Sequence, residues 1–473
     1  MTDFSSDFTM TIDGKAATAA ATLPVRNPAT DSVFAQVPDA GQAELDLAVA
    51  AAARAFPGWA ATPVEERRAA LRAIAAIVTE NIQPLSRLLT QEQGRPLADA
   101  LGELGATSYW ATATADMALP GAETDGPQGR VITRYVPLGV VGAIVPWNYP
   151  ILLSMFKILP ALLTGNTLVL KPSPYTPLTS LKLGELLRGV LPDGVLNVIS
   201  GGDALGPLLT AHPDIAKISF TGSTATGKRV MAGAAATLKR VTLELGGNDA
   251  AIVLPDVDVD KIAEPLFWAA FRNSGQICVA TKRIYIHEDI YDRLSAALAD
   301  YARGVVVGDG LEQGTRLGPV QNRLQYDRVK DLIADAKANG LTFLTGGDVD
   351  ESRAGYFIPV TIVDNPPDDA RVVVEEAFGP VLPLLKYRDI DDAVARANAT
   401  TVGLGGSVWS SDMNAAAAVA ERLETGTVQI NGPASPNPHH PFGGHKQSGL
   451  GAENGPDGLL AYTNPKVISI PKG

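Results

Sequence analysis

The stretch Val140-Val141-Gly142-Ala143-Ile144-Val145 is a short apolar run that ends at Pro146-Trp147-Asn148 and precedes residues with helical periodicity. An apolar run of this length predicts a buried strand. Similar runs recur at 167–170, 195–199 and 216–220, and each precedes a further helical pattern. Strands that alternate with helices are typical of a parallel sheet with right-handed crossovers. The sequence therefore predicts an α/β protein whose chemistry lies at the carboxyl ends of these strands.

The segments on either side of this sheet have their own patterns. Alternating residues between Ile12 and Pro38 predict short edge strands, and the Ala-rich segment 42–118 predicts a scaffold layer of helices. A second α/β unit is expected after Cys278. Its predicted elements are a strand at 283–287, helices at 290–301 and 325–338, and strands at 356–360, 372–374 and 462–470.

Length and charge limit the class of protein. A chain of 473 residues is too long for one ordinary core, so we expect two or three domains. The net charge of −12 argues against nucleic acid or an anionic membrane as a partner. No apolar run approaches the ~20 residues that span a bilayer. Because Met1–Phe8 also lacks a secretory signal pattern, a cytoplasmic protein is expected.

Cys278 is the only cysteine, and it follows Asn273-Ser274-Gly275-Gln276-Ile277. A single thiol cannot form an intrachain disulfide or a cysteine metal cluster, which leaves a buried apolar residue or a reactive nucleophile. Gly275 permits a tight turn, and the polar neighbours are poor company for a core residue. This pattern favours a nucleophile presented by a loop.

Other motifs are more ambiguous when they are taken singly. Glu244, between two leucines and before Gly246-Gly247, is either a surface charge or a carboxyl in an apolar pocket. Burial would raise its pKa toward the value that a general base needs. Phe220–Gly227 lies between a strand and a helix but is a weak phosphate-binding signal alone. His439-His440 has no acidic or cysteine partner nearby, so no metal site is expected.

The run Phe271–Cys278 resembles the nucleophile motif of the NAD(P)-dependent aldehyde dehydrogenases, and the resemblance extends from about Ile12 to the C-terminus. It implies a Rossmann-like parallel-sheet cofactor domain, a second α/β catalytic domain and a small β element for oligomerisation. The family's last strand and one hairpin pair with a neighbouring subunit, which implies a homodimer or homotetramer. The expected domains are 1–118 with 138–246 for the cofactor, 247–445 for catalysis, and 119–137 with 446–473 for oligomerisation.

The resemblance also implies roles for single residues. Cys278 would attack the aldehyde, Asn148 and the Cys278 backbone N–H would stabilise the oxyanion, and Glu244 would activate water. Lys171 would place charge beside the cofactor ribose, and Glu453 would relay protons behind Glu244. NAD or NADP would be bound by Ile144, Trp147, Lys171, Ser173, Gly202, Gly206, Gly222, Ser223, Gln325, Glu376 and Phe378.

Two positions depart from patterns within the family. Pro174 stands where many NAD-preferring members have a glutamate that repels the 2′-phosphate of NADP, so the cofactor preference stays open. Arg272 matches an arginine that grips the substrate carboxylate in succinate-semialdehyde dehydrogenases, but Phe156 replaces their second arginine. The expected pocket lining is mostly apolar: Tyr149, Leu153, Phe156, Arg272, Ile277 and Phe442.

We therefore expect oxidation of an aromatic or medium aliphatic aldehyde to the acid, with Arg272 bracing the Cys278 loop. The alternative is a carboxylate-bearing aldehyde such as succinate semialdehyde. A CoA-acylating relative would not need the base Glu244. A non-enzymatic binding protein would not need Asn148, Glu244, Cys278 and Glu376 together.

Overall fold

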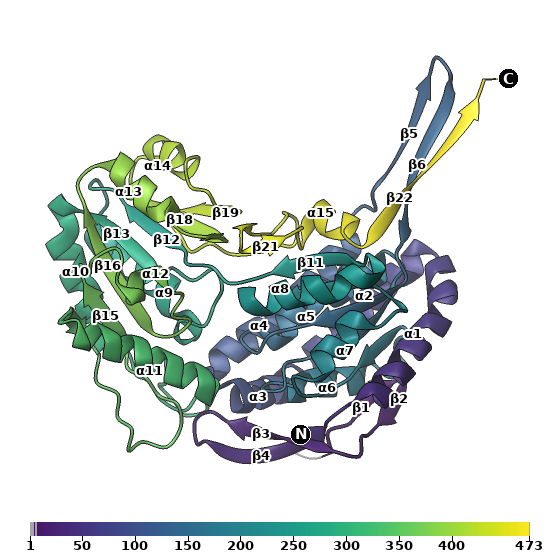
Figure 1. Cartoon of the computed structure of the whole chain (residues 1–473), viewed down its shortest axis with the longest axis horizontal. Helices are drawn as coiled ribbons and strands as arrows, with labels where there is room; N and C mark the ends of the chain where they lie inside the picture. Colours follow the sequence, from purple (N-terminus) through teal and green to yellow (C-terminus); the bar gives the residue numbers. More distant parts are fainter. Residues whose placement is uncertain (1–3, 5–6, 473) are drawn as a thin grey trace.

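The structure is a computed structural model that describes residues 4 and 7–472. Most of Met1–Phe8, the segment expected to lack a secretory signal, lies outside the described residues. Two α/β units lie side by side, and a three-stranded arm projects away from them (Figure 1). No helix of the described part is long and apolar enough to cross a membrane.

The first unit is built on an eight-stranded sheet. Its five central strands are parallel and follow the spatial order β9-β8-β7-β10-β11, with antiparallel strands at both edges. The chain reverses direction across the sheet between β7 and β10, and this is the position where such sheets bind dinucleotides. The bounds in spatial order are β2 (Lys15–Ala17), β1 (Met10–Ile12), β9 (Leu196–Val198), β8 (Thr167–Lys171), β7 (Val140–Ile144), β10 (Ile215–Thr221), β11 (Arg240–Glu244) and β21 (Gly449–Leu450).

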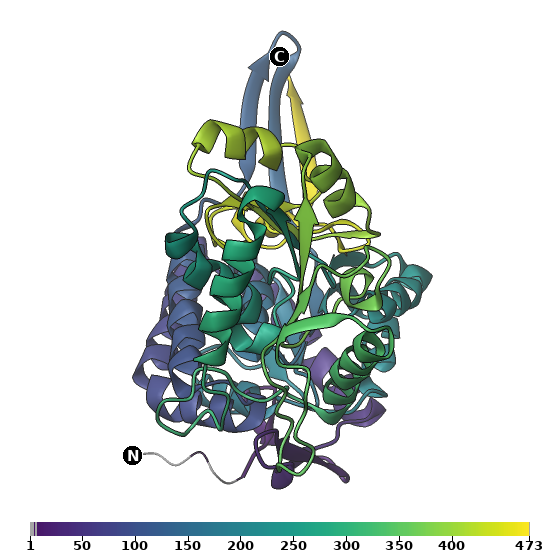
Figure 2. The same cartoon turned by 90° about the vertical axis from the view of Figure 1, so that its left-hand side faces the viewer.

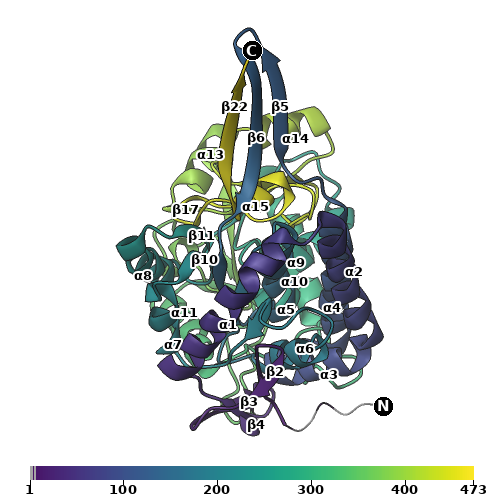
Figure 3. The same ribbon diagram turned by 90° about the vertical axis from the view of Figure 1, so that its right-hand side faces the viewer.

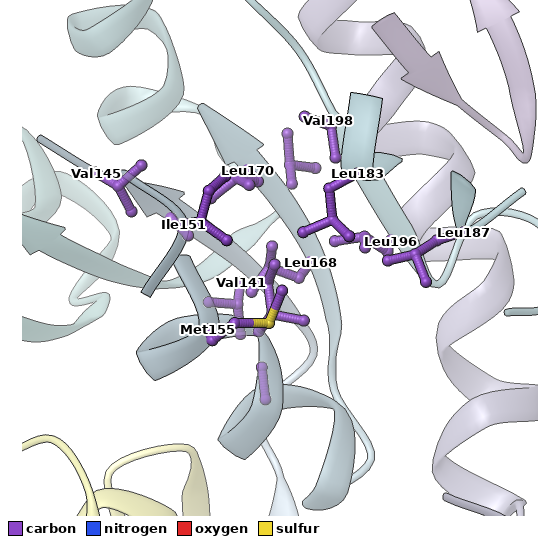
Figure 4. Close-up of a cluster of buried hydrophobic side chains, with 14 of the residues drawn as sticks. Val141, Val145, Ile151, Met155, Leu168, Leu170, Leu183, Leu187, Leu196 and Val198 are labelled. Atoms are coloured by element: carbon purple, nitrogen blue, oxygen red, sulfur yellow. The ribbon is translucent and has the colours of Figure 1, made fainter. Parts of the chain in front are cut away.

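The helices of this unit form two groups, one with α1, α7 and α8 in contact and one with α5 and α6. Figure 4 shows Ile151 and Met155 of α5 and Leu183 of α6 among apolar strand residues such as Val141 and Leu168. In Figure 3, α1 runs in front of the strands. The bounds are α1 (Gln42–Ala61), α2 (Val64–Glu80), α3 (Ile82–Gln93), α4 (Leu97–Asp116), α5 (Pro150–Leu163), α6 (Leu178–Leu186), α7 (Leu205–Ala211) and α8 (Thr224–Ala234).

The second unit is built on a seven-stranded sheet with helices on both sides (Figure 2). Alternate residues of β12 belong to two separate apolar clusters. Ala250 and Ile252 pack in one cluster, and Ala251 and Val253 pack in the other. Only β14 is antiparallel. The bounds in spatial order are β14 (Thr342–Thr345), β15 (Thr361–Asp364), β16 (Val381–Tyr387), β13 (Arg283–His287), β12 (Ala250–Val253), β18 (Gly405–Trp409) and β19 (Thr427–Ile430), with helices α9 (Val259–Phe271), α10 (Glu288–Arg303), α11 (Arg323–Ala338), α13 (Ile390–Asn398) and α14 (Met413–Ala420).

These elements confirm the predicted α/β class and most of the predicted strands and helices, but two predicted strands are wrong. Residues 356–360 form no strand, because Tyr356 pairs its backbone with Pro28 and Val320 and because Pro359 has no N–H to donate. Residues 372–374 belong to the helical turn α12 (Arg371–Val374). An ion pair between Arg371 and Glu375, four residues apart, supports that turn.

The arm consists of β22 (Thr463–Pro471), β6 (Gly129–Pro137) and β5 (Gly121–Gly126), with β6 in the middle. Its edge strand β22 exposes apolar side chains, and Val467 is 62% exposed. The predicted arm segment 446–473 starts too early. Residues 449–450 pair with β11 in the first sheet, and 455–460 form helix α15 (Gly455–Leu460) against α5. The remaining strands are the hairpin β3 (Thr22–Asn27) and β4 (Ser32–Pro38), and the short pair β17 (Val402–Gly403) and β20 (His445–Lys446).

Candidate active site

The loop that carries Cys278 is held in an unusual backbone conformation. It connects α9 to β13, and Asn273, Ser274 and Gly275 have φ values of 53°, 55° and 74°. A Cβ on Gly275 would lie 2.2 Å from the carbonyl oxygen of Gly379, so only glycine fits this approach. Non-glycine residues with positive φ are strained and persist where surrounding contacts hold them.

Polar side chains within the loop provide those contacts. Asn273 Nδ2 donates to the carbonyl of Asn148 at 3.1 Å, and Ser274 Oγ donates to the carbonyl of Gly318 at 2.7 Å. Gln276 Nε2 donates to the carbonyl of Asn273 at 2.9 Å, and Gln276 Oε1 accepts the backbone N–H of Gln321 at 2.9 Å. The polar neighbours that suggested a reactive loop thus fix its shape.

Asn148 lies after β7 and faces this loop. Its Nδ2 donates to the carbonyl of Gln276 at 3.0 Å, and its side chain is buried. A primary amide nitrogen carries two hydrogens, and only one of them has an acceptor among the described residues. The second N–H of Asn148 therefore remains available to a substrate oxygen.

A buried ion pair positions the turn that contains Asn148. Arg95 Nη1 lies 2.5 Å from Glu103 Oε2, and neither side chain is exposed. Arg95 also donates to the carbonyl of Asn148, and Glu103 Oε1 accepts the first backbone N–H groups of α5, from Ile151 and Leu152. Sequence reasoning missed both residues. The sequence offers little signal for them, because Arg95 lies just before and Glu103 within a helical segment that carries other charged and polar residues.

Glu244 lies at the carboxyl end of β11, beside Thr221 of β10. It is buried, and neither carboxylate oxygen has a hydrogen-bond partner in the described part of the chain. Burial, followed by the negative charge of Glu453, raises the pKa of Glu244 well above its ordinary value of 4.5. Glu244 is therefore a buried carboxyl and not a surface charge, and its backbone carbonyl accepts the N–H of Gly222 at 2.9 Å.

A buried polar group lies behind Glu244. Lys157 Nζ donates to Glu453 Oε1 at 2.5 Å and to Thr221 Oγ1 at 2.7 Å. Ser219 Oγ donates to the same carboxylate at 3.3 Å. The positive charge of Lys157 lowers the pKa of Glu244 and partly offsets the effect of Glu453. Sequence reasoning identified Glu453 but missed Lys157, which lies on an apolar helix.

The thiol of Cys278 is surrounded by titratable groups. Burial, with smaller contributions from the carboxylates of Asp249, Glu376 and Glu244, raises the pKa of Cys278 to about 12. The positive charge of Lys282 lowers it. A thiol with this pKa is protonated at neutral pH, so a base must remove its proton before it can attack a carbonyl.

The residues expected to bind the cofactor gather at the carboxyl ends of the neighbouring strands β8, β7 and β10. Ser223 caps α8, and its Oγ accepts the N–H of Thr226 at 3.3 Å. The rest of the helix N-terminus stays available to an anion. A Cβ on Gly206 would meet no atom within 4 Å, so open space lies beside α7. Burial lowers the pKa of Lys171, at the end of β8, to about 8, whereas Asp203 and Asp39 raise it. The others on this side are Ile144, Trp147, Ser173, Gly202 and Gly222, all at carboxyl ends of strands or in the loops that follow.

The second unit brings three more of these residues to the same place, Glu376 and Phe378 on a loop after α12 and Gln325 on α11. Glu376 Oε1 accepts the N–H of Gly247 at 3.3 Å, and Gln325 Nε2 donates to the carbonyl of Phe378 at 3.2 Å. The rings of Phe378 and Trp147 lie edge to face at 5.3 Å. Open space, a free helix N-terminus and a pre-oriented carboxylate fit a nicotinamide dinucleotide. The Cys278 and Glu376 loops precede β13 and β16, so the second sheet contributes the amino ends of its strands.

A pocket of about 160 Å³ opens beside Cys278. Its wall is mostly apolar, and Asn148 lies in the same wall. The six residues expected to line a substrate pocket all border it, namely Tyr149, Leu153, Phe156, Arg272, Ile277 and Phe442. Sequence reasoning did not identify the further lining residues Leu152, Trp268, Ala269, Val279 and Ala280. The wall is completed by Pro433, Ala434, Ser435 and Pro436.

Arg272 borders the pocket with an exposed side chain, which makes no hydrogen bond or ion pair with any residue that the structure describes. The side chains of Asn273, Ser274 and Gln276 make the hydrogen bonds that brace the Cys278 loop, and bracing by Arg272 stays a prediction. His439 and His440 are exposed, and within residues 4 and 7–472 no cluster of three or more potential ligands could hold a metal ion.

A thiol, an uncommitted amide donor and a buried carboxylate at a dinucleotide-binding edge define a dehydrogenase with a cysteine nucleophile. Comparison with known proteins agrees. Residues 15–468 match the sequence profile of the Aldehyde dehydrogenase family. The chain is 39% identical to phenylacetaldehyde dehydrogenase of Pseudomonas fluorescens, over 95% of this chain and 92% of that protein. It is also 39% identical to the succinate-semialdehyde dehydrogenase [NADP(+)] GabD of Escherichia coli K12, over 95% of this chain and 94% of that protein.

The crystal structure of an NADP-dependent enzyme from E. coli superposes with a TM-score of 0.95 at 38% identity, covering 98% of both chains. The chain belongs to the aldehyde dehydrogenase family. It is an oxidoreductase that acts on an aldehyde with NAD or NADP as its cofactor.

Proposed function

We propose that this enzyme oxidises an aromatic or medium aliphatic aldehyde to the carboxylic acid. The observation that carries the proposal is the pocket of about 160 Å³ beside Cys278, whose wall is mostly apolar and aromatic. Phe156 and Phe442 supply apolar surface, and binding pockets of this composition favour neutral ligands. The relatives named above act on both kinds of aldehyde, so the pocket is the better guide to the substrate.

The first half of the reaction makes a thioester on Cys278. The thiol of Cys278 loses its proton to solvent water, and the thiolate attacks the aldehyde carbon. Asn148 Nδ2 and the backbone N–H of Cys278 stabilise the oxyanion of the resulting thiohemiacetal. When bound, NAD(P)+ accepts the hydride from this carbon. Lys171, Ser173, Gly206, Gly222 and Ser223 would hold it on one side, and Gln325, Glu376 and Phe378 on the other.

The second half hydrolyses the thioester. Glu244 takes a proton from water, and the hydroxide attacks the acyl carbon while the thiolate of Cys278 leaves. The buried pair of Lys157 and Glu453 lies behind Glu244 and can pass the proton away from the site. A CoA-acylating enzyme would not need this base. The products are the carboxylic acid and the free thiolate, ready for another turnover.

A second candidate is an aldehyde with a distal carboxylate, such as succinate semialdehyde. The observation that favours it is the free guanidinium of Arg272 in the pocket wall. Guanidinium binds carboxylate in a bidentate manner. Phe156 lies where a second arginine would complete the grip, so this candidate ranks below the first.

The arm supports a homodimer or homotetramer. The edge strand β22 exposes Val467, Ile468 and Ile470 and has unpaired backbone groups along one side. Such an edge is a template for pairing with another chain. On this proposal, residues 121–137 and 463–471 form the oligomerisation element. The unit built on the first sheet is the cofactor domain, and the unit built on the second sheet, which carries Cys278, is the catalytic domain.

The test uses the single thiol. Reaction with iodoacetamide should add one carboxamidomethyl group per subunit at Cys278, found by mass spectrometry, and should abolish dehydrogenase activity in proportion. Cys278→Ala should retain the fold and lose activity. Benzaldehyde and succinate semialdehyde are then compared by kcat/KM with each cofactor. Full activity of Cys278→Ala would overturn the mechanism, and a higher kcat/KM for the semialdehyde would promote the second candidate.

A further inference from the structure

Lys282 lies four residues after the nucleophile, where the loop enters β13, and its side chain is only 6% exposed. Its Nζ donates to three backbone carbonyls of the nucleophile loop, those of Ile277 at 2.9 Å, Cys278 at 2.6 Å and Ala280 at 3.1 Å. An ammonium group has three N–H donors and no acceptor. The three converging carbonyls therefore use the full donor capacity of Lys282.

The same ammonium group faces the cofactor loop. Lys282 Nζ lies 3.6 Å from Glu376 Oε1, the oxygen that also accepts the N–H of Gly247. Arg328 approaches Glu376 from α11 but bonds to its backbone carbonyl rather than to its carboxylate. Lys282 is thus the side chain that joins the carboxylate of Glu376 to the loop of Cys278.

The surrounding charges make this cation important. Besides Glu376, the carboxylates of Asp249, directly before β12, and of Glu244, at the end of β11, act on the Cys278 thiol, and both raise its pKa. Asp249 is buried and lies near Arg283 as well as Lys282. Among the charged groups with the largest effects on the thiol pKa, Lys282 is the one that favours the thiolate. Its loss would leave the negative charges of Asp249, Glu376 and Glu244 as the main electrostatic influence on the thiol.

We propose that Lys282 is a positioning residue for the reaction, which fixes the Cys278 loop through its carbonyls, holds Glu376 toward the cofactor, and stabilises the thiolate by its charge. The proposal rests on Cys278 being the nucleophile. Lysine is suited to the task because its ammonium is a compact charge with rotatable donors, whereas guanidinium is a planar fork. One side chain thereby couples nucleophile reactivity to cofactor binding.

The test compares Lys282→Met with the wild-type enzyme and with the surface control Lys261→Met, whose lysine is 82% exposed in its side chain. The readout is the rate constant for alkylation of Cys278 by iodoacetamide between pH 7 and 10, followed by mass spectrometry in the full-length enzyme. Alkylation below the thiol pKa follows the thiolate fraction, so a loss of one pKa unit of stabilisation slows it about ten-fold at each pH. We expect about this loss in Lys282→Met, none in Lys261→Met, and partial recovery in Lys282→Arg.

A second readout addresses the cofactor. Lys282→Met should also raise the Kd for NAD or NADP, measured by fluorescence quenching without substrate. If Lys282→Met does not fold, Lys282→Gln, which keeps N–H donors without charge, provides the same comparison. Unchanged alkylation rates and cofactor Kd in the folded variant would overturn the proposal. Alkylation that leaves wild-type activity intact would instead overturn the assignment of Cys278, so the two failures are distinguishable.

Discussion

Lys157 Nζ lies 2.5 Å from Glu453 Oε1 in the protein interior, and this ion pair acts on the pKa of Glu244 with both of its charges. Glu453 raises the pKa and Lys157 lowers it. Because both charges are buried, their effects on Glu244 are weakly screened by salt. The pair therefore helps to set the pH range in which Glu244 is an ionised base.

Glu244→Gln should stop hydrolysis of the thioester more than its formation. Loss of a general base typically slows its step by about 10²–10⁴-fold. Glutamine has the same size, so the buried site should keep its shape. Rapid mixing should show an initial burst of reduced cofactor near one per active site, followed by very slow turnover. A variant with normal steady-state turnover would show that another group activates water.

The pH dependence of hydrolysis should move when Glu453 is neutralised. The pKa of Glu244 is raised, so its base form is lost as the pH falls through that raised value, and hydrolysis slows on the acid side. Glu453→Gln removes a negative neighbour, so the pKa of Glu244 falls and the acid limb shifts to lower pH. The measurement is the pH profile of the slow phase after the burst.

The control for this shift is Glu453→Asp, which keeps the charge and should keep the profile closer to that of the wild type. Glu453→Gln also leaves Lys157 buried without its partner, a change that typically costs about 3–5 kcal/mol of folding stability. Denaturant unfolding of both variants checks that cost. An acid limb that moves to higher pH in Glu453→Gln would contradict the electrostatic argument.

The parts of the site that lie next to recognisable local patterns could be predicted from the sequence. Asn148, Glu244 and Cys278 each follow or end an apolar strand or a turn with distinctive neighbours. Arg95, Lys157 and Lys282 could not be predicted, because each is a single charge whose partners are set by tertiary packing. Lys157 and Glu453, for example, are separated by 296 positions.

The same reason explains the errors in the fold. The apolar run 356–360 looks like a strand, but its backbone groups bond to Pro28 and Val320, which lie far away in the chain. The end of the chain was divided wrongly because residues 449–450 pair with β11. Local periodicity identifies a segment that can be buried, whereas long-range hydrogen bonds decide which partner it takes.

Asn148→Ala should slow formation of the thioester. It removes an N–H donor to the oxyanion, which is typically worth about 3–4 kcal/mol in the transition state. The substitution also removes the hydrogen bond from Nδ2 to the carbonyl of Gln276 in the Cys278 loop. Alkylation of Cys278 by iodoacetamide is therefore the control for the shape of the loop, and it should proceed near the wild-type rate. A change confined to the KM for the cofactor would exclude Asn148 from the oxyanion site.

Pro174→Glu should reduce the use of NADP more than the use of NAD. The new carboxylate would stand three positions after Lys171, a lysine on which the charges of Asp203 and Asp39 already act. Repulsion of the 2′-phosphate would then disfavour NADP specifically. The wild-type enzyme should show measurable activity with both cofactors. Equal losses in kcat/KM with NAD and NADP would show that residue 174 does not contact the adenosine ribose.

Arg272→Leu should distinguish the two candidate substrates. Because the guanidinium borders the pocket without a partner, its removal should lower kcat/KM for succinate semialdehyde and leave benzaldehyde almost unchanged. A charge-assisted hydrogen bond is worth about 1.5–3 kcal/mol, and solvent exposure of Arg272 should keep the loss near 1.5. Arg272→Lys keeps the charge but not the planar fork, so it should recover only part of the loss.

The comparison that decides is the ratio of the two kcat/KM values in wild type and variant. Under the proposed function, the wild-type enzyme prefers benzaldehyde, because Phe156 and Phe442 favour a neutral ring and a carboxylate in an apolar pocket loses hydration. A wild-type preference for succinate semialdehyde that disappears in Arg272→Leu would instead establish the second candidate. An equal loss for both aldehydes would mean that Arg272 supports the Cys278 loop after all, through contacts that form only when substrate is bound.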